Sequence, residues 1–281
     1  MTYAGIWKRL EPVCGTGEAK AVARLVLETR FGLSMTDICC GATERMDGVE
    51  LAELEAILRR IEGGEPVQYV LGTACFCGRD FHVEPGVLIP RPETEELCAW
   101  ITECHGGGSG RQAILDVGTG SGCIAITLAL DMPGSDVTAW DISPVAVRVA
   151  HENAQTLGAE ADIRMQDALC PPDGGRWDIV VSNPPYIYNK EREGMERNVL
   201  EHEPHTALFV PDDNPLLFYD AIAGYAGRTL SPGGMVYFEI NPLCRADMER
   251  MLTGKGFTGV ECRKDMFGRD RMMRARKRLT E

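Results

Sequence analysis

A short apolar run enters a glycine-rich loop at Ile114-Leu115-Asp116-Val117-Gly118-Thr119-Gly120-Ser121-Gly122, and residues 123–130 then have the composition of a helix. Glycine permits a tight turn and a close approach of the backbone to a ligand. The spacing G-x-G-x-G is shorter than the G-x-G-x-x-G spacing that is typical of a pyrophosphate on a helix N-terminus. We therefore expect a strand, loop and helix that bind a nucleoside without phosphates, and a nicotinamide cofactor is the weaker hypothesis.

From Ala113 onward, short apolar runs alternate with segments of helical composition. The main apolar runs are 114–117, 137–140, 179–181 and 235–240, and the helical segments are 124–130, 145–155, 216–225 and 247–252. Such alternation is typical of a mainly parallel sheet with helices on both faces. The sequence therefore predicts an α/β fold for this part of the chain.

The N-terminal part of the chain differs, because apolar residues between Glu18 and Ile61 recur at helical spacing. Gly63-Gly64-Glu65-Pro66 ends this pattern, and short β runs follow at 69–72 and 76–83, with a turn at 78–80. A further break, Gly106-Gly107-Gly108-Ser109-Gly110, precedes the run at 114–117. We expect a helical domain at 1–66, a β-hairpin linker at 67–92 and an α/β domain at 93–281.

The composition is that of a globular protein, with 281 residues of which 44% are hydrophobic and 25% charged. No apolar run reaches the roughly 18 residues of a membrane-spanning helix, and the N-terminus lacks the pattern of a signal peptide, so we expect a cytoplasmic protein with no membrane partner. The net charge of -13 opposes specific binding of DNA, whose binders gain affinity by neutralising phosphates. The basic stretch from Arg269 to Arg278 is either a solvated strand and tail or a contact for RNA or ribosome-associated material.

The eleven cysteines are scattered along the chain, without a CxxC pair or a histidine at metal-binding spacing. We therefore expect reduced thiols and no metal site. The five histidines share no spacing either, so none of them is assigned as a catalytic base.

Two acids follow the predicted strands of the α/β domain. Asp141 ends the run 137–140, roughly twenty residues beyond the glycines, where an acid can accept from both hydroxyls of a ribose. The segment Asp141-Ile142-Ser143-Pro144 is also typical of a helix start, with Ser143 before a proline, and both interpretations can hold together. Asp167 follows the third strand region, where it either accepts from an adenine amine or is an ordinary loop acid.

The run 177–182 ends in the tetrad Asn183-Pro184-Pro185-Tyr186. Neither proline has an N–H, so this stretch cannot continue the hydrogen bonds of a sheet. The carbonyl of Pro184 and the side-chain oxygen of Asn183 can both accept from one planar NH2 group, and Tyr186 offers a flat face against it. The tetrad therefore predicts a socket for an amide or an exocyclic amine, and the alternative is a strand that ends in a proline turn.

Together, the glycine loop, Asp141 and the tetrad resemble the class I S-adenosylmethionine-dependent amino methyltransferases. Within that class, the chain is similar to the protein-(glutamine-N5) methyltransferases of peptide chain release factors, the HemK or PrmC family. The tetrad alone is shared with adenine-N6 methyltransferases, whereas Pro90-Arg91-Pro92-Glu93-Thr94-Glu95 is far more specific. The other segments that carry the likeness are 65–72, Leu88-Ile89, Ile187, Glu203-Pro204, 207–209 and 268–271.

The resemblance implies an N-terminal helical domain that helps to engage the release factor, a β-hairpin linker and a Rossmann-like methyltransferase domain with a seven-stranded sheet. It implies transfer of a methyl group from S-adenosylmethionine to the glutamine of the Gly-Gly-Gln motif in class 1 release factors, with S-adenosylhomocysteine as product. It assigns catalysis to Asn183, Pro184 and Tyr186, and substrate binding to the whole tetrad with Pro185. The residues that it implies for cofactor binding are Gly118, Thr119, Gly120, Ser121, Gly122, Asp141, Asp167, Ala168 and Asn183.

Several details stay open at this point. Ala168 stands where family members often carry an aromatic residue, and Asn241-Pro242 follows Glu239-Ile240 where many have glycine. Thr94 is a candidate cap for a helix through 97–101. Arg91 and Glu93 either fold over the methionine end of the cofactor or pair with each other.

Two other functions are weighed against glutamine methylation. Adenine-N6 methylation of DNA or RNA needs a flipped base and should bring a target-recognition domain and a basic groove, neither of which is evident. A non-catalytic cofactor-binding scaffold is disfavoured because the glycine loop and the tetrad are both intact.

Overall fold

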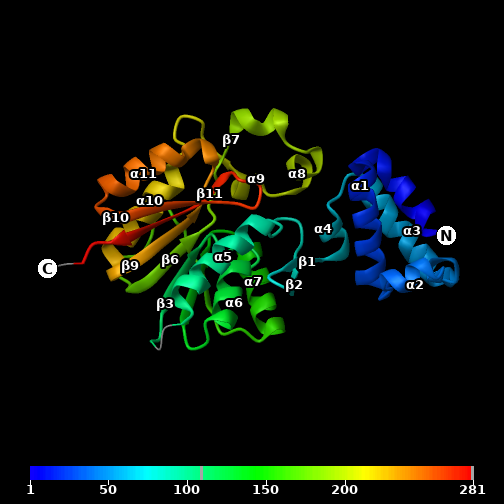
Figure 1. The fold of residues 1–281 in the computed structure, drawn as a ribbon, viewed down its shortest axis with the longest axis horizontal. Coiled ribbons are helices and arrows are strands. Elements are labelled where there is room, and N and C mark those ends of the chain that lie inside the picture. Colours follow the sequence, from blue (N-terminus) through cyan, green and yellow to red (C-terminus); the bar gives the residue numbers. More distant parts are fainter. Residues whose placement is uncertain (108–109, 280–281) are drawn as a thin grey trace. The chain divides into compact units, whose positions relative to one another are not determined.

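The structure is a computed structural model that describes residues 1–107 and 110–279 (Figure 1). Gly108 and Ser109 of the predicted glycine-rich break lie outside the described residues, as do the last two residues of the chain. The chain forms two compact units. The first comprises Met1–Thr73 and Glu196–His202, and the second comprises Ala74–Met195 and the chain from Glu203 onward.

The first unit is helical, as the sequence predicts. Its elements are α1 (Tyr3–Phe31), α2 (Met35–Cys39), the 3-10 turn η1 (Ala42–Glu44), α3 (Gly48–Glu62), α4 (Val67–Leu71) and α8 (Arg197–His202). Helix α1 is kinked at Gly15, whose φ of 72° lies outside the helical region. Asp47 begins α3 with a capping box, in which its side chain accepts from the backbone of Glu50 and Glu50 accepts in return. Apolar side chains of α1, α3 and α4 form the core of this unit.

The prediction of a β run at 69–72 is wrong, because these residues belong to helix α4 and its cap. Gly72 ends the helix with a φ of 72°, and Val67 and Val70 pack into the core of the first unit. This packing outweighs the β preference of an apolar stretch. The predicted hairpin does form just beyond, from β1 (Thr73–Phe76) and β2 (Arg79–His82).

The second unit is built on a seven-stranded sheet with the strand order β10-β11-β9-β6-β3-β4-β5. Neighbouring strands from β9 to β5 pair in parallel, and β11 pairs antiparallel with both β9 and β10. The mainly parallel sheet is therefore confirmed. The strands are β3 (Ala113–Val117), β4 (Asp136–Asp141), β5 (Asp162–Met165), β6 (Trp177–Ser182), β9 (Leu230–Glu239), β10 (Phe257–Lys264) and β11 (Asp270–Lys277).

Helices cover both faces of this sheet (Figure 1). One face is covered by α5 (Pro92–His105), α6 (Cys123–Asp131) and α7 (Pro144–Leu157), and the other by α10 (Leu217–Thr229) and α11 (Arg245–Gly254). Successive residues of β6 point to opposite faces, so Ile179 and Val181 pack with the first group and Val180 with the second. Both faces of the central strands are therefore buried.

The strand order reverses beside β3, and this reversal positions the site. The chain runs from β3 outward through β4 to β5 and then returns to β6 on the other side of β3. Ligands of open α/β sheets bind at such a switch point, beyond the carboxyl ends of the strands. The segments β7 (Ile187–Tyr188), η2 (Asn189–Gly194), α9 (His205–Leu208), β8 (Phe209–Val210) and η3 (Pro242–Cys244) complete the unit. Among the described residues, no helix has the length and apolar character needed to span a bilayer.

Candidate functional site

The loops that follow β3, β4, β5 and β6 line one cavity of about 410 Å³. This volume lies within the usual range for small-molecule sites, which runs from roughly 300 to 1,000 Å³. The predicted site residues that line the cavity are Gly118, Thr119, Gly120, Ser121, Asp141, Asp167, Ala168, Asn183, Pro184 and Pro185. Gly122 and Tyr186 are not among the lining residues.

The glycine loop after β3 has the left-handed backbone that the sequence suggests. Gly118, Gly120 and Gly122 have φ values of 77°, 57° and 84°. A Cβ on Gly118 or Gly120 would meet no protein atom within 4 Å, so both backbones face open space beside the cavity that they line. Gly122 has a packing role instead, because a Cβ there would lie 2.8 Å from Cδ1 of Ile126 and 3.2 Å from Cβ of Ala150.

Asp141 joins the glycine loop to the end of β4. Its Oδ2 accepts from the N–H of Gly120 at 2.8 Å, and its Oδ1 accepts from the N–H of Ser143 at 2.9 Å. Burial raises the pKa of this carboxyl, while the backbone donors act against the rise. Each oxygen keeps a further lone pair for a ligand hydroxyl. The side chain of Ser143 caps α7, so the predicted helix start is confirmed.

The third loop, after β5, supplies polar and apolar groups to the same cavity. Oδ1 of Asp167 accepts from the N–H of Leu169 at 2.8 Å, which holds the loop. Ala168 and Leu169 line the cavity here, and Ile142 lines it from the β4 loop. An open glycine backbone, a fixed carboxylate and these apolar walls fit a nucleoside-containing ligand.

The tetrad follows β6, which is tied to β3 where Oγ of Ser182 donates to the carbonyl of Val117 at 2.6 Å. Asn183 lines the cavity, and its Nδ2 donates to Oγ1 of Thr94 at 3.2 Å. The hydroxyl of Tyr186 donates to Oε1 of Glu239 at 2.8 Å. Tyr186 therefore braces the tetrad from behind the cavity wall.

Two residues were not assigned to the site from the sequence: Thr94, which lines the cavity, and Glu239, which contacts Thr94 and Tyr186 from outside it. Thr94 does not cap α5, because Arg91 occupies the cap position, and its hydroxyl instead donates to Oε2 of Glu239 at 2.6 Å. Burial raises the pKa of Glu239, and the hydrogen bonds from Thr94 and Tyr186 act against the rise. The signal available in the sequence was an acid at the end of an otherwise apolar strand.

Arg91 pairs with Glu203 and not with Glu93. Its Nη2 lies 2.5 Å from Oε1 of Glu203, and the N–H of Ile89 donates to Oε2 of the same side chain at 3.2 Å. Glu203 is buried, whereas Arg91 lines the cavity. Glu203 therefore fixes the segment from Ile89 to Arg91, just before α5, at the cavity wall.

Asp116 lies in strand β3, just before the glycine loop begins. Its Oδ2 accepts from Oγ1 of Thr119 at 2.6 Å and from the N–H of Ala125 at 3.2 Å, and within the described part of the chain Oδ1 has no hydrogen-bond partner. The side chain is fully buried, and this burial raises the pKa of the carboxyl to about 7. The group is therefore poised to gain or lose a proton near neutral pH.

Across residues 1–107 and 110–279, no cluster of three or more His, Cys, Asp or Glu side chains could hold a metal ion. The described cysteines are all free thiols.

Comparison with known proteins identifies similar chains. Residues 8–72 match the PrmC N-terminal domain family, and residues 107–205 match the methyltransferase small domain family. A release factor glutamine methyltransferase from Bacteroides thetaiotaomicron is 43% identical over 97% of this chain and 98% of its own. A relative of the same name from Flavobacterium psychrophilum is 39% identical over 92% of this chain and 91% of its own. Among solved structures, a 16S rRNA methyltransferase from T. thermophilus with AdoMet and guanosine shares the fold, with a TM-score of 0.55, 23% identity and coverage of 73% of this chain and 50% of that chain.

The Gly122→Ala substitution tests the packing role of the last loop glycine. We expect a loss of at least about 1 kcal/mol in the free energy of unfolding beyond that of Gly134→Ala, because Gly134 has a similar φ of 89° but no atom within 4 Å of its Cβ position. Both values are measured by urea denaturation. Equal losses in the two variants would show that crowding at Gly122 contributes nothing.

Asp116→Asn tests the buried carboxyl. The folded protein keeps a proton on Asp116 up to about pH 7, whereas the unfolded chain releases it near the usual value of 3.8. Stability should therefore fall as the pH rises through this window, by at most about 1.4 kcal/mol per pH unit. Asparagine stays neutral, so the variant should lose less stability than the wild type between pH 5 and 7 in urea titrations. Parallel pH profiles for the two proteins would contradict the shift.

Proposed function

The chain belongs to the family of release factor glutamine methyltransferases, and we propose that its Asn183–Tyr186 tetrad holds the glutamine amide that is methylated. The enzyme transfers a methyl group from S-adenosylmethionine to the side-chain amide nitrogen, N5, of a glutamine in peptide chain release factors. We assign the target to the Gly-Gly-Gln motif of class 1 factors. The observation that carries the role of the tetrad is the anchoring of Asn183 through Nδ2 to Thr94, which turns its oxygen into the group offered to the substrate.

The tetrad answers the main chemical difficulty of the reaction. An amide nitrogen is a poor nucleophile because its lone pair is delocalised, as the barrier of roughly 18 to 20 kcal/mol to rotation about a peptide bond shows. Two acceptors, Oδ1 of Asn183 and the carbonyl of Pro184, can hold both N–H bonds and favour a pyramidal nitrogen in the transition state. Pro184 and Pro185 contribute no competing N–H donor.

The residues of the cavity divide into a cofactor part and a substrate part in this proposal. S-adenosylmethionine supplies an electrophilic methyl group when bound. The glycine loop from Gly118 to Gly122 provides the close backbone approach, Asp141 accepts from the ribose hydroxyls, and Asp167 with Ala168 lies at the adenine. Asn183 stands where the two parts meet. No side chain is needed as a strong base, because an N-methylated cationic amide is acidic enough to lose its proton to water.

We assign engagement of the release factor to the helical domain at 1–66, because residues 8–72 match the PrmC N-terminal domain family. The acidic net charge of -13 suits a protein partner better than a nucleic acid. We place the enzyme in the cytoplasm, where release factors act.

The cations near the C-terminus favour a structural role over a contact with RNA or the ribosome. Arg274 pairs with Glu261 at 2.6 Å, and Arg271 pairs with Asp265 at 3.2 Å. Nζ of Lys277 donates to the carbonyl of Leu230 at 2.6 Å. These groups are occupied inside the second unit.

The substrate is tested by incubating the protein with labelled S-adenosylmethionine and, in separate reactions, a class 1 release factor, its Gly-Gly-Ala variant, DNA or RNA. We expect label on the release factor alone, and none on the variant that lacks the glutamine. Label on nucleic acid but not on the factor would overturn the proposal.

The Asn183→Ala substitution tests the tetrad. Methyl transfer should fall by at least about a hundredfold, the order expected when a reacting group loses its positioning, while the Kd for S-adenosylmethionine is retained. Asn189→Ala is the matched control, because Asn189 is exposed, lies outside the cavity and should leave transfer unchanged. Near-normal turnover in Asn183→Ala would remove Asn183 from the mechanism.

A further inference from the structure

A buried acid lies behind the tetrad, at the end of β9. Strands β6 and β9 are parallel, with Ser182 opposite Phe238, so Glu239 lies level with the start of the tetrad. Its side chain is only 1% exposed, yet both carboxyl oxygens are engaged. Oε2 accepts from Thr94 at 2.6 Å and Oε1 accepts from Tyr186 at 2.8 Å. Glu239 is thus joined to the tetrad at both ends, directly through Tyr186 and through Thr94 to Asn183.

The chemistry of these groups fixes the direction of each hydrogen bond. An ionised carboxylate only accepts, and a hydroxyl has a single hydrogen to donate. Because Thr94 gives its hydrogen to Glu239, its oxygen can only accept from Asn183. An accepting partner attracts the NH2 end of the Asn183 amide, at the observed 3.2 Å, and turns the oxygen end away.

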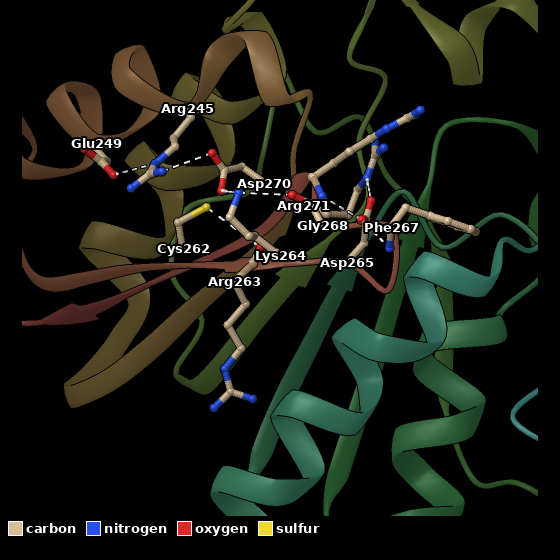
Figure 2. A network of polar contacts seen from close by, with 11 residues as sticks. Arg245, Glu249, Cys262, Arg263, Lys264, Asp265, Phe267, Gly268, Asp270 and Arg271 are labelled. Carbon is tan, nitrogen blue, oxygen red and sulfur yellow. Dashed lines mark hydrogen bonds and ion pairs between the residues drawn. The ribbon is translucent and has the colours of Figure 1, made fainter.

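Arg271 supports the ionised form of Glu239. The positive charge of Arg271 on β11 acts against the rise in the pKa of Glu239 that burial causes, whereas Glu93 on α5 adds to that rise. Arg271 is held in turn by Asp265, whose Oδ1 also accepts from the N–H groups of Phe267 and Arg269 at 3.0 and 2.9 Å. Figure 2 shows this turn, with Asp265 between Arg271 and the backbone near Phe267. The β10–β11 turn therefore places a fixed cation near the carboxylate.

We propose that Glu239 is a positioning residue that sets the polarity of the Thr94 hydroxyl and thereby presents the oxygen of Asn183, rather than its nitrogen, to the substrate amide. This inference rests on the proposed role of the tetrad. In this proposal, a side chain outside the cavity determines which end of the Asn183 amide faces the substrate. The oxygen end accepts from a glutamine NH2, whereas the nitrogen end would repel it.

Glu239→Gln tests this directly, because glutamine has the same shape but carries one donor end. If its NH2 faced Tyr186, the tyrosine hydroxyl would lose the carboxylate that accepts its hydrogen. If its NH2 faces Thr94, every group is satisfied, but Thr94 then donates and the Asn183 amide reverses. We expect kcat to fall by at least about tenfold. KM for the release factor and Kd for S-adenosylmethionine should stay within about twofold of the wild type, and the unfolding temperature should stay within a few degrees of it.

Two variants of Thr94 separate polarity from packing. Thr94→Val keeps the volume but removes the hydroxyl, so kcat should fall as in Glu239→Gln. Thr94→Ser restores a hydroxyl and should rescue most of that loss. Glu261→Gln is the control for a carboxylate lost elsewhere in the same sheet, since Glu261 on β10 pairs with Arg274 outside the cavity, and it should leave kcat unchanged.

A wild-type kcat in Glu239→Gln, or in Thr94→Val, would overturn the inference. That failure is distinguishable from failure of the proposed function. In the first case the wild-type enzyme still methylates the release factor and Asn183→Ala still lowers transfer by the predicted factor, whereas in the second the wild-type enzyme leaves the factor unlabelled.

Discussion

The site depends on the parallel pairing of β3 with β6 at the point where the strand order reverses. Val117 lies opposite Ser182, and the Ser182 hydroxyl donates to the Val117 carbonyl at 2.6 Å. Each strand then leaves the sheet, one into the glycine loop and the other into the tetrad. Because parallel neighbours end at the same edge, two segments far apart in sequence open onto one cavity. The cofactor and the substrate amide can therefore meet in that cavity.

Polarity is the second constraint, and it distinguishes this site from a generic nucleoside pocket. The proposed substrate amide donates two N–H groups, so the site must present hydrogen-bond acceptors to it and no competing donors. Prolines at 184 and 185 remove two backbone donors, and the contact with Thr94 engages one N–H of the Asn183 amide. The hydroxyl of Tyr186 donates its hydrogen to Glu239, so it is not available as a donor to the substrate. The same polarity would suit an adenine amine, so identification of the substrate as a protein amide rests on the family to which the chain belongs.

Much of this arrangement can be predicted from the sequence, because the features concerned are determined by residues that are close to one another in the chain. The strand, glycine loop and helix around residues 114–130, the helix cap at Ser143 and the strand before Asn183 depend on neighbours within a few residues. What escaped prediction depends on distant partners. Thr94 meets Glu239 across 145 positions and Arg91 meets Glu203 across 112, and no spacing rule links such pairs. Helix α4 was missed for a related reason, since this short segment of five residues takes the conformation that its tertiary core favours.

The most direct test of the account is the position of the substrate amide in a crystal structure of the enzyme with S-adenosylhomocysteine and a release factor. We predict that the glutamine amide nitrogen lies within about 3.2 Å of both Oδ1 of Asn183 and the carbonyl oxygen of Pro184. An amide nitrogen that contacts neither oxygen, or that faces the Nδ2 end of Asn183, would contradict it.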